Sequence, residues 1–239
     1  MMNIALVGYG KMGKAIEKVA IERGHKIIAK IGRDGFTPSD IALADVCIEF
    51  SRPESGFKNI QKCILAGKNV VSGTTGWLNK MPEMKDIVKE NEGSFFYSSN
   101  FSLGVNIFFA VNQYLAKIMN HFGDYDVNVH EVHHTQKLDA PSGTAITIAQ
   151  QIVNNISRKK GYDLDATAKD MLKITADRID PAPGTHHVKY SSTIDDIEII
   201  HTAHSRLGFA TGAVLAAEWL QNKTGTFGME DMLKLNDLK

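Results

Sequence analysis

The chain has 239 residues, of which 43% are hydrophobic and 23% are charged, a composition typical of a folded globular protein rather than a disordered one. Lysine plus arginine and aspartate plus glutamate are balanced at 27 each, so there is no global positive field to attract nucleic acid or an acidic membrane surface. This length is enough for one large hydrophobic core or two modest ones.

The first residues, MMNIALV, form a core-strand pattern rather than the charged and then apolar stretch of a secretory signal. No apolar run approaches the length of a membrane span, so we expect a cytoplasmic protein without a membrane partner. The two cysteines, Cys47 and Cys63, fit neither a disulfide framework nor a metal-binding spacing. Both are predicted to be small core residues.

A GxGxxG motif follows the predicted first strand, residues 3–7, and opens a predicted helix over residues 12–23. In dinucleotide-binding folds the first glycine permits a tight turn, the second lets pyrophosphate approach the backbone, and the third allows close helix packing. This placement favours a dinucleotide site over an ordinary glycine-rich turn. The cofactor-binding residues predicted here are Gly8, Tyr9, Gly10, Lys11, Met12 and Gly13.

The residue after the second predicted strand, residues 26–31, selects between NADH and NADPH. An acidic side chain there binds a ribose 2′-hydroxyl, whereas arginine or lysine accepts a 2′-phosphate. This chain has Gly32 followed by Arg33, which favours NADPH, while the nearby Asp34 keeps NADH binding possible.

Further strands and helices alternate along the first hundred residues, which predicts a Rossmann-type, doubly wound parallel sheet in an α/β protein. The strands are expected at 45–50, 69–72 and 94–98, and the helices at 53–66 and 82–91. Gly73, Thr74 and Thr75 follow a strand at its carboxyl end, where open α/β sheets bind ligands. An ordinary turn is the competing interpretation of this loop.

The pattern then changes to that of a smaller α+β domain with a mixed sheet and helices on one face. Its elements are expected at 105–118 (helix), 125–133, 173–176, 188–193 and 197–202 (strands). A helix expected at 213–220 returns to pack on the dinucleotide domain. Residues 157–170 are predicted to be a surface connection. His186 and His187 lie in a predicted Pro and Gly loop, where they could line a cleft but are expected to be solvated. The predicted domains are 1–103 with 208–239, for the dinucleotide, and 104–207, for substrate binding and tetramerisation.

The segment EVHHTQKLDAPSGTA, residues 131–145, carries the chemistry. The alternating strand pattern ends at His133, and Gly143 and Thr144 lie where an apolar helical pattern begins. A helix N-terminus offers free backbone N–H groups to an anion such as a carboxylate. Lys137 adds a charge and a proton, and a histidine beside it can act as acid or base near neutral pH.

These histidines have two other possible interpretations. The letters HEVHH match the HExxH zinc pattern, but on a strand His130 and His134 are roughly 13 Å apart, too far to share one ion. We therefore predict no metal site. A pair of ordinary strand-end histidines is the second alternative, and the polar groups that converge beside a helix N-terminus argue against it.

This segment resembles the signature of the 4-hydroxy-tetrahydrodipicolinate reductase family, also called dihydrodipicolinate reductases, of the diaminopimelate and lysine pathway. Three further blocks resemble the same family in the same order: FSRPES at 50–55, SGTTGW at 72–77 and SSNFSLGVN at 98–106. The resemblance implies NAD(P)H-dependent reduction of a cyclic dicarboxylate and a homotetramer formed through the second-domain sheets. It also implies cofactor contacts from Gly73, Thr74, Thr75, Ser98, Ser99, Asn100 and Phe101.

Hydride addition leaves negative charge on the substrate ring, so the protein must supply a proton and hold two carboxylates. We predict Lys137 as the proton donor and His133 as its acid or base partner. His134 is predicted to contact substrate, and Gly143 and Thr144 to bind a carboxylate. Arg206 resembles a family arginine near the substrate, but a surface salt bridge suits it equally, so it is not assigned.

Three other functions remain as alternatives. One is a zinc hydrolase that uses the HExxH letters, which metal analysis would test. A regulatory protein could bind NAD(P) without turning it over, keeping the glycines but needing neither His133 nor Lys137. A Rossmann reductase could also act on another imine or carbonyl substrate.

Overall fold

The computed structural model describes residues 1–205 and 207–235. The chain divides into two compact units: unit 1 comprises Met1–Leu103 and Leu207–Lys234, and unit 2 begins at Gly104 and extends to the described residue 205. Among the described residues, no helix is both long and apolar enough to cross a membrane.

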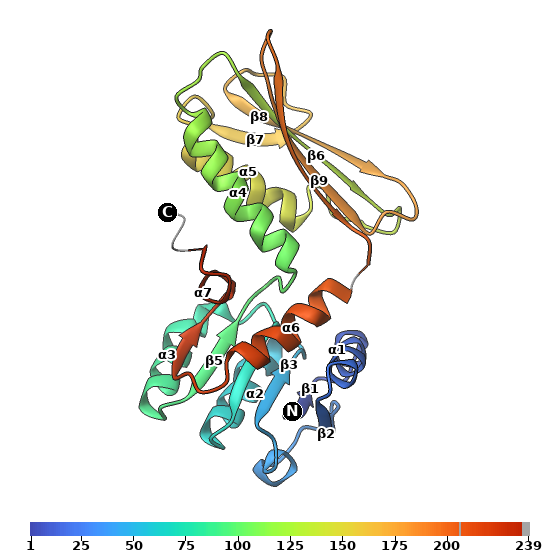
Figure 1. Ribbon diagram of the computed structural model, residues 1–239, viewed down its shortest axis with the longest axis vertical. Helices are drawn as coiled ribbons and strands as arrows, with labels where there is room; N and C mark the ends of the chain where they lie inside the picture. Colours follow the sequence, from blue (N-terminus) through green and yellow to red (C-terminus); the bar gives the residue numbers. More distant parts are fainter. Residues whose placement is uncertain (206, 236–239) are drawn as a thin grey trace. The chain divides into compact units, whose positions relative to one another are not determined.

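Unit 1 is built on a six-stranded sheet in the order β11-β5-β4-β3-β1-β2, with every neighbouring pair parallel (Figure 1). Its strands are β1 (Asn3–Val7), β2 (Lys26–Ile31), β3 (Val46–Glu49), β4 (Asn69–Ser72), β5 (Ser94–Tyr97) and β11 (Gly225–Phe227). Its helices are α1 (Lys11–Glu22), α2 (Pro53–Leu65), α3 (Met81–Glu90), α6 (Leu207–Trp219) and α7 (Met229–Met232), with short 3₁₀ turns at Pro38–Ile41 and Leu78–Lys80.

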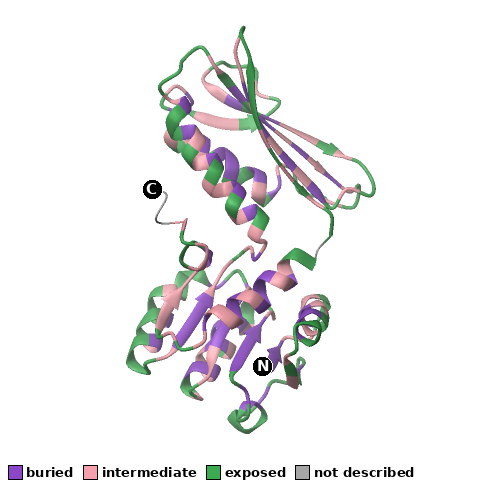
Figure 2. Ribbon diagram, viewed as in Figure 1, coloured by how far each residue is buried: buried purple, intermediate pink, exposed green. Residues whose placement is uncertain are grey.

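Both faces of this sheet are buried, because side chains of successive strand residues point to opposite sides. In β1, Ile4 and Leu6 pack with α1 and α6, whereas Ala5 and Val7 pack on the other face with α2 and α3. Figure 2 shows the central strands as continuously buried segments. This arrangement confirms the predicted doubly wound sheet, and Cys47 and Cys63 are buried core residues as expected.

Unit 2 contains a five-stranded mixed sheet in the order β10-β9-β6-β8-β7. The strands are β6 (Asp126–His133), β7 (Gly161–Leu164), β8 (Met171–Arg178), β9 (Gly184–Ser191) and β10 (Asp196–Ala203). The β6 strand is parallel to β8 and antiparallel to β9. The helices α4 (Leu103–Met119) and α5 (Gly143–Asn155) lie on the same side of this sheet, which confirms the predicted mixed sheet with helices on one face (Figure 1).

Two local predictions were wrong. Residues 161–164, expected within a surface connection, form strand β7 along β8. The sequence analysis predicts no element for residues 225–227, which add β11 to the first sheet. These strands have four and three residues, too short to show a period of two. His186 and His187 belong to strand β9 rather than to a solvated loop, and His186 is buried. Arg206 lies outside the described residues.

Helix α6 packs so closely on the backbone before α4 that one of its glycines is obligatory. A Cβ atom at Gly212 would lie 1.8 Å from the carbonyl oxygen of Phe101, whereas a Cβ at Gly208 in the same helix would approach no closer than 3.8 Å to Ser102. We therefore infer that Gly212 is fixed by packing and Gly208 is not.

A Gly212→Ala variant should be destabilised by at least about 1–3 kcal/mol, the usual cost of overpacking, despite the better helix propensity of alanine. Gly208→Ala is the matched control and should be neutral or slightly stabilising. Urea unfolding of both variants measures the difference. Equal midpoints for the two variants would show that the packing of α6 on Phe101 is not constraining.

Candidate active site

The glycine loop after β1 has the geometry that a dinucleotide phosphate requires. Gly8 has a positive φ of 98°, and a Cβ there would lie 2.0 Å from the carbonyl oxygen of Phe50. A Cβ at Gly13 would lie 2.4 Å from the carbonyl oxygen of Gly8, so α1 packs directly on the turn. At Gly10, by contrast, an added Cβ would meet nothing within 4 Å. The second glycine therefore leaves the N-terminus of α1 open to a ligand.

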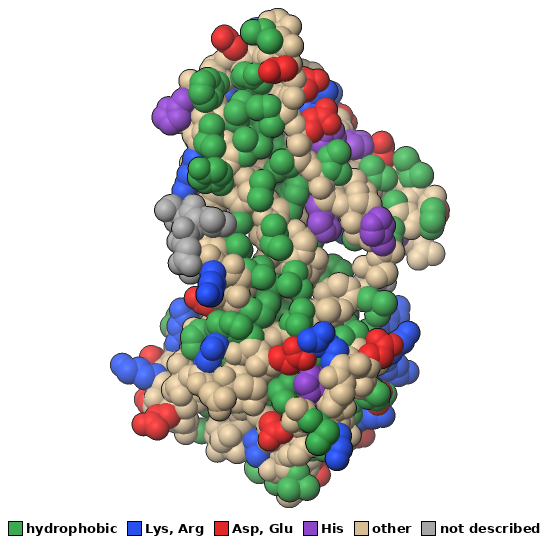
Figure 3. All heavy atoms as spheres, viewed as in Figure 1, with side chains coloured by type: hydrophobic (Ala, Val, Ile, Leu, Met, Phe, Trp, Pro, Cys, Tyr) green, Lys and Arg blue, Asp and Glu red, His purple; other side chains and the backbone are tan. Residues whose placement is uncertain are grey.

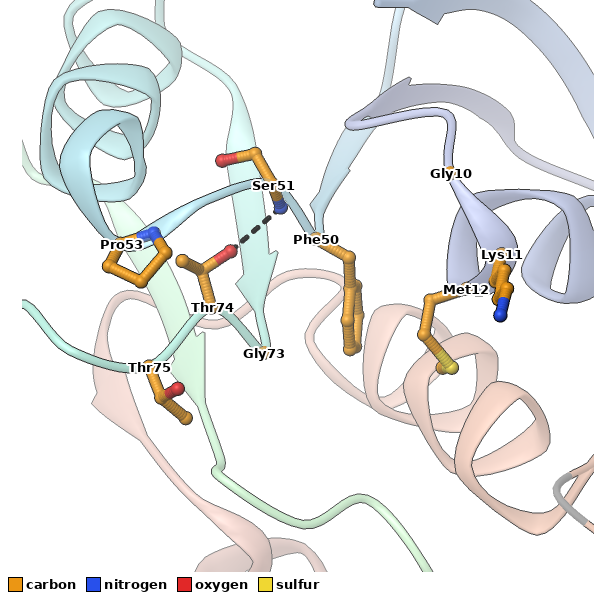
Figure 4. A pocket seen from close by; sticks show the side chains of 9 residues that line it. All are labelled: Gly10, Lys11, Met12, Phe50, Ser51, Pro53, Gly73, Thr74 and Thr75. Carbon is orange, nitrogen blue, oxygen red and sulfur yellow. Dashed lines mark hydrogen bonds between the residues drawn. The ribbon is translucent and has the colours of Figure 1, made fainter. Parts of the chain in front are cut away.

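Two cavities adjoin this loop within unit 1. The larger, about 930 Å³, is lined at one side by Gly8, Tyr9 and Gly10 and at another by Gly32, Arg33 and Gly35. The smaller, about 360 Å³, lies between Gly10, Lys11 and Met12 and the loop Gly73–Thr74–Thr75. Figure 4 shows Phe50 standing between that loop and Met12. These cavities bring together nine of the fourteen residues predicted to bind cofactor.

The remaining predicted cofactor residues do not line either cavity. Gly13 acts through helix packing, as described above. Ser98 and Asn100 form a turn in which Ser98 Oγ donates to the Asn100 carbonyl at 2.7 Å, and Phe101 is buried against Phe50, with ring centroids 5.5 Å apart. The predicted cofactor contacts of Ser98, Ser99, Asn100 and Phe101 therefore stay predictions.

A buried glutamate, Glu49, holds two residues that line the smaller cavity, Ser51 and Thr74. It lies at the end of β3 and accepts hydrogen bonds from the hydroxyls of Ser51, Ser72 (2.7 Å) and Thr74 (3.0 Å). The Ser51 amide in turn donates to Thr74 Oγ1 at 2.8 Å, the dashed line in Figure 4. Burial raises the pKa of Glu49, although these hydrogen bonds act in the opposite direction. The sequence analysis missed this residue, because it looks like one more position of a buried strand.

In unit 2, strand β6 ends at His133 and helix α5 begins at Gly143, as the sequence predicts. Ser142 caps the helix, with its Oγ accepting from the Ala145 amide at 3.1 Å. Gly143 is exposed, and an added Cβ there would meet nothing within 4 Å, so the first turn of α5 is accessible to an anion. Thr144, the next residue, is half-buried.

The centre of this site is Glu131, which is fully buried on β6. The Ser142 amide donates to both of its carboxylate oxygens at 3.1 and 3.2 Å, and Arg178 Nη2 donates to Oε1 at 3.2 Å. His133 Nδ1 and His186 Nε2 lie 3.5 and 3.6 Å from Oε2. Four segments of unit 2 therefore meet at one carboxylate.

Lys137 lies on the loop that this network holds. Its Nζ donates to both carboxylate oxygens of Asp139 at 2.7 Å, an ion pair that lowers the pKa of Asp139. Arg178 clamps the same loop, because its Nε donates to the Lys137 carbonyl at 3.2 Å and its Nη2 to the Asp139 carbonyl at 2.6 Å. His134, the predicted substrate contact, is half-buried next to His133.

The two central groups have shifted pKa values. Burial acts to raise the pKa of Glu131, but hydrogen bonds from His186, Ser142 and Arg178 outweigh it and lower that pKa to about 2. Burial lowers the pKa of His133 to about 4, although attraction to Glu131 acts in the opposite direction. At neutral pH the site therefore holds a charged carboxylate beside a neutral imidazole.

The geometry does not support the HExxH interpretation. His130 lies within strand β6, where its ring nitrogens face Thr175 Oγ1 at 2.7 Å and Asp177 Oδ2 at 3.4 Å. In the described part of the chain, a different group, Glu131 with His133 and His186, brings its possible ligand atoms within 4.8 Å of one another. A cation there would have to share Glu131 with the guanidinium of Arg178, so we do not assign a metal to this group.

Comparison with known proteins decides the family. Residues 2–101 match the model described as dihydrodipicolinate reductase, N-terminus, and residues 104–233 match dihydrodipicolinate reductase, C-terminus. The 4-hydroxy-tetrahydrodipicolinate reductase of Christiangramia forsetii is 52% identical over 234 residues, which cover 97% of this chain and 98% of that protein. The chain belongs to the dihydrodipicolinate reductase family.

More distant members of the dihydrodipicolinate reductase family agree. The 4-hydroxy-tetrahydrodipicolinate reductase of Neisseria meningitidis serogroup B is 34% identical over 231 residues, which cover 92% of this chain and 85% of that protein. A solved structure of dipicolinate-bound dihydrodipicolinate reductase from Paenisporosarcina sp. TG-14 superposes with a TM-score of 0.78, at 19% identity, over 97% of this chain and 99% of that one. At that identity the match establishes a shared fold.

The sequence analysis of this dihydrodipicolinate reductase family member missed three residues of the unit 2 site. Glu131 stands in the signature, but its strand position gives no sign of its partners. Arg178 and His186 come from β8 and β9, more than forty residues along the chain. His186 lies in the first half of β9, whose residues alternate between buried and less buried positions. Because β9 begins within the predicted Pro and Gly loop, this part of the strand was not recognised from the sequence.

The depressed pKa of His133 should make unit 2 sensitive to acid. The unfolded state binds a proton at a pKa of about 6.5 and the folded state at about 4, so this contribution to stability is complete above pH 6.5 and is lost as the pH falls towards 4. Between pH 7 and 4.5 the loss should be roughly 2–3 kcal/mol. A His133→Gln variant should lose this part of the pH dependence in urea titrations.

The exposed His121 of unit 2 provides the control. His121→Gln should keep the wild-type pH dependence, because this exposed side chain is not part of the Glu131 network. Parallel stability curves for wild type and His133→Gln between pH 7 and 4.5 would contradict the assigned environment of His133.

Proposed function

We propose that this protein reduces 4-hydroxy-tetrahydrodipicolinate, by way of dihydrodipicolinate, to tetrahydrodipicolinate with NAD(P)H, in lysine and diaminopimelate biosynthesis. The names of the relatives at 52% and 34% identity support this substrate. The observation that carries the proposal is the constellation of His133, Lys137 and the open start of α5, in a chain whose other unit has a dinucleotide loop. We assign dinucleotide binding to unit 1 and substrate binding to unit 2.

The start of α5 is suited to one carboxylate of the substrate. The side chain of Ser142 caps the Ala145 amide, and in the described part of the chain no side chain is seen to cap the amides of Gly143 and Thr144. The helix dipole favours negative charge there. The Thr144 hydroxyl adds a donor. A dicarboxylate, dipicolinate, is bound in the solved relative from Paenisporosarcina, which is consistent with this choice.

Lys137 is the proton donor in this proposal. Because the pKa of His133 is near 4, its imidazole is neutral at pH 7 and carries no proton to spare, whereas the lysine ammonium has three. Asp139 holds that ammonium in the free protein. We infer that a substrate carboxylate takes the place of Asp139, while His133 and His134 complete the polar surroundings of the ring.

The residues around the glycine loop fit a nicotinamide dinucleotide. The open position at Gly10 and the N-terminus of α1 suit the pyrophosphate, and the loop Gly73–Thr74–Thr75 suits the nicotinamide end. When bound, the reduced cofactor supplies the hydride. Arg33 lines the larger cavity and Asp34 does not, which supports a preference for NADPH over NADH.

We also propose a homotetramer built through unit 2. Helix α4 has an exposed apolar stripe at Ile107, Val111, Tyr114 and Ile118, and Figure 3 shows apolar side chains gathered over this helix. Strand β10 is a sheet edge with exposed isoleucines at 194, 197 and 200 near and along it. Unpaired edges and apolar surface of this kind favour association. Cytoplasmic location stays a prediction from the sequence.

One assay tests the function directly. The freshly formed condensation product of pyruvate and aspartate semialdehyde is mixed with the protein and NADPH or NADH, and the absorbance of the reduced nicotinamide is followed. Oxidation that depends on both substrate and enzyme is expected. Cofactor binding without turnover would instead indicate an NAD(P)-sensing protein, and turnover only with other imines or carbonyls would indicate a different reductase.

Lys137→Ala should lower kcat by at least about 10²-fold, the lower range for loss of a general acid, because it removes the proton source. Lys160→Ala is the matched control: Lys160 forms a similar lysine–aspartate pair, 3.0 Å from Asp170, but on an exposed surface of unit 2. Its kcat should be unchanged. If Lys137→Ala changes only KM, the assignment of Lys137 as the proton donor is wrong.

Arg33→Ala should weaken NADPH by about tenfold or more, the size of a lost charged hydrogen bond, and leave NADH nearly unaffected. Gly32→Asp should shift the ratio of kcat/KM values towards NADH, because a carboxylate repels a 2′-phosphate. Steady-state kinetics with both cofactors measure the two effects. Equal losses for NADPH and NADH in Arg33→Ala would place Arg33 away from the 2′-phosphate.

A further inference from the structure

The two oxygens of the Glu131 carboxylate have different neighbours, a guanidinium at one and two imidazoles at the other. Oε1 accepts from the guanidinium of Arg178, and the Ser142 amide lies across both oxygens. Oε2 faces the two imidazoles of His133 and His186. Arg178 and the amide of Ser142 can only donate, so the carboxylate is held in one orientation with a single oxygen directed at the histidines.

The neutral ring of His133 carries one N–H proton, either on Nδ1 or on Nε2. Its Nδ1 is buried and has no hydrogen-bond partner within normal limits among the described residues, and Glu131 Oε2 lies 3.5 Å away. A neutral imidazole carries its proton on one nitrogen only. A proton on Nδ1 points at the negative oxygen, whereas a lone pair there would face negative charge inside a dry site. The other nitrogen, Nε2, then stays unprotonated.

We propose that Glu131 is a positioning residue that fixes His133 as the neutral Nδ1–H tautomer and, through Arg178, holds the Lys137 loop beside it. The inference rests on the proposed function for its role in catalysis. The charge of Glu131 thus positions both groups that take part in proton transfer. The His133 imidazole presents a proton acceptor at Nε2, and the Lys137 ammonium presents a proton donor. The separation of 3.5 Å between His133 Nδ1 and Glu131 Oε2 is expected to shorten to hydrogen-bond distance when substrate fills the site.

Arg178 connects the two effects. Its guanidinium spans from Glu131 to the carbonyls of Lys137 and Asp139, so the loop position depends on the same carboxylate as the imidazole. A planar fork with five donors can make these contacts together, which the single ammonium of a lysine cannot.

His186 extends the network to the carboxylate-binding turn. Its ring packs edge to face on His133, with centroids 5.1 Å apart, and its Nε2 shares a hydrogen bond with Ser142 Oγ at 3.1 Å. Ser142 also caps α5, whose first turn offers the amides of Gly143 and Thr144. Glu131 is therefore linked, directly or through one residue, to the His133 imidazole, the Lys137 loop and the start of α5.

The test is Glu131→Gln, which keeps the shape and removes the charge. Arg178 and the Ser142 amide require an oxygen, so the new amide must turn its NH₂ group towards the histidines. That group is a donor, and His133 should therefore invert, with Nδ1 becoming the acceptor and Nε2 carrying the proton. We expect ¹⁵N NMR of histidine-labelled, ligand-free protein to show protonated Nδ1 in wild type and protonated Nε2 in the variant.

In the assay, Glu131→Gln should lower kcat by about 10²-fold or more, with the KM for the reduced cofactor unchanged. Glu131→Asp retains the charge and should recover the Nδ1–H signal and part of kcat. Arg178→Lys should keep the His133 tautomer but lose kcat, because it releases the Lys137 loop. Thermal unfolding of each variant verifies that unit 2 is folded.

Glu198→Gln is the matched control, since Glu198 also pairs with a histidine, His187, at 3.2 Å, but on exposed sheet surface. It should change neither the His133 signal nor kcat. Protonated Nε2 in the wild type, or the same tautomer in wild type and Glu131→Gln, would overturn the proposal. These spectra need no substrate, so a failure of the proposed reaction would appear separately, as absence of turnover in wild type.

Discussion

The ionised carboxylate of Glu131, taken out of water, is the constraint on which the polar site of unit 2 depends. A buried charge is tolerated only if its lone pairs are satisfied, and here a backbone amide, a guanidinium and two imidazoles surround it. These groups come from β6, β8, β9 and the start of α5, so satisfying one charge fixes the relative positions of four segments. The chemistry of His133 and Lys137 then follows from where this charge places them.

Unit 1 meets a different requirement, the close approach of a ligand to backbone. At Gly8 and Gly13 the neighbouring backbone leaves no room for a Cβ atom, whereas the position at Gly10 is open. Beside the neighbouring loop, Glu49 accepts hydrogen bonds from three hydroxyls, among them those of Ser51 and Thr74. In both units, then, a buried glutamate at or near the end of a strand organises the neighbouring loops, one by accepting hydrogen bonds from hydroxyls and the other by positioning charged groups.

Much of this was accessible from sequence, for identifiable reasons. The period of two, the GxGxxG turn and the helix start at Gly143 are local patterns, and the structure has them where they were expected. The exceptions depend on contacts distant in sequence. Strands β7 and β11 are defined by their neighbours more than by their own residues, and His186 is buried because β9 lies against β6. Likewise, Arg178 becomes part of the site only when β8 pairs with β6.

The charge state of Glu131 can be measured without any substrate. In a ¹³C NMR titration of the side-chain carboxyls, with the Glu131 resonance assigned by its loss in Glu131→Gln, the structure predicts a midpoint near 2, well below the ordinary value of 4.5. The Glu131 signal should therefore stay constant as the pH falls from 7 to about 5, above the range in which the neighbouring His133 takes up its proton. A midpoint at 4.5 or higher would mean that the surrounding donors do not hold a charged carboxylate, and the account of the site would be wrong.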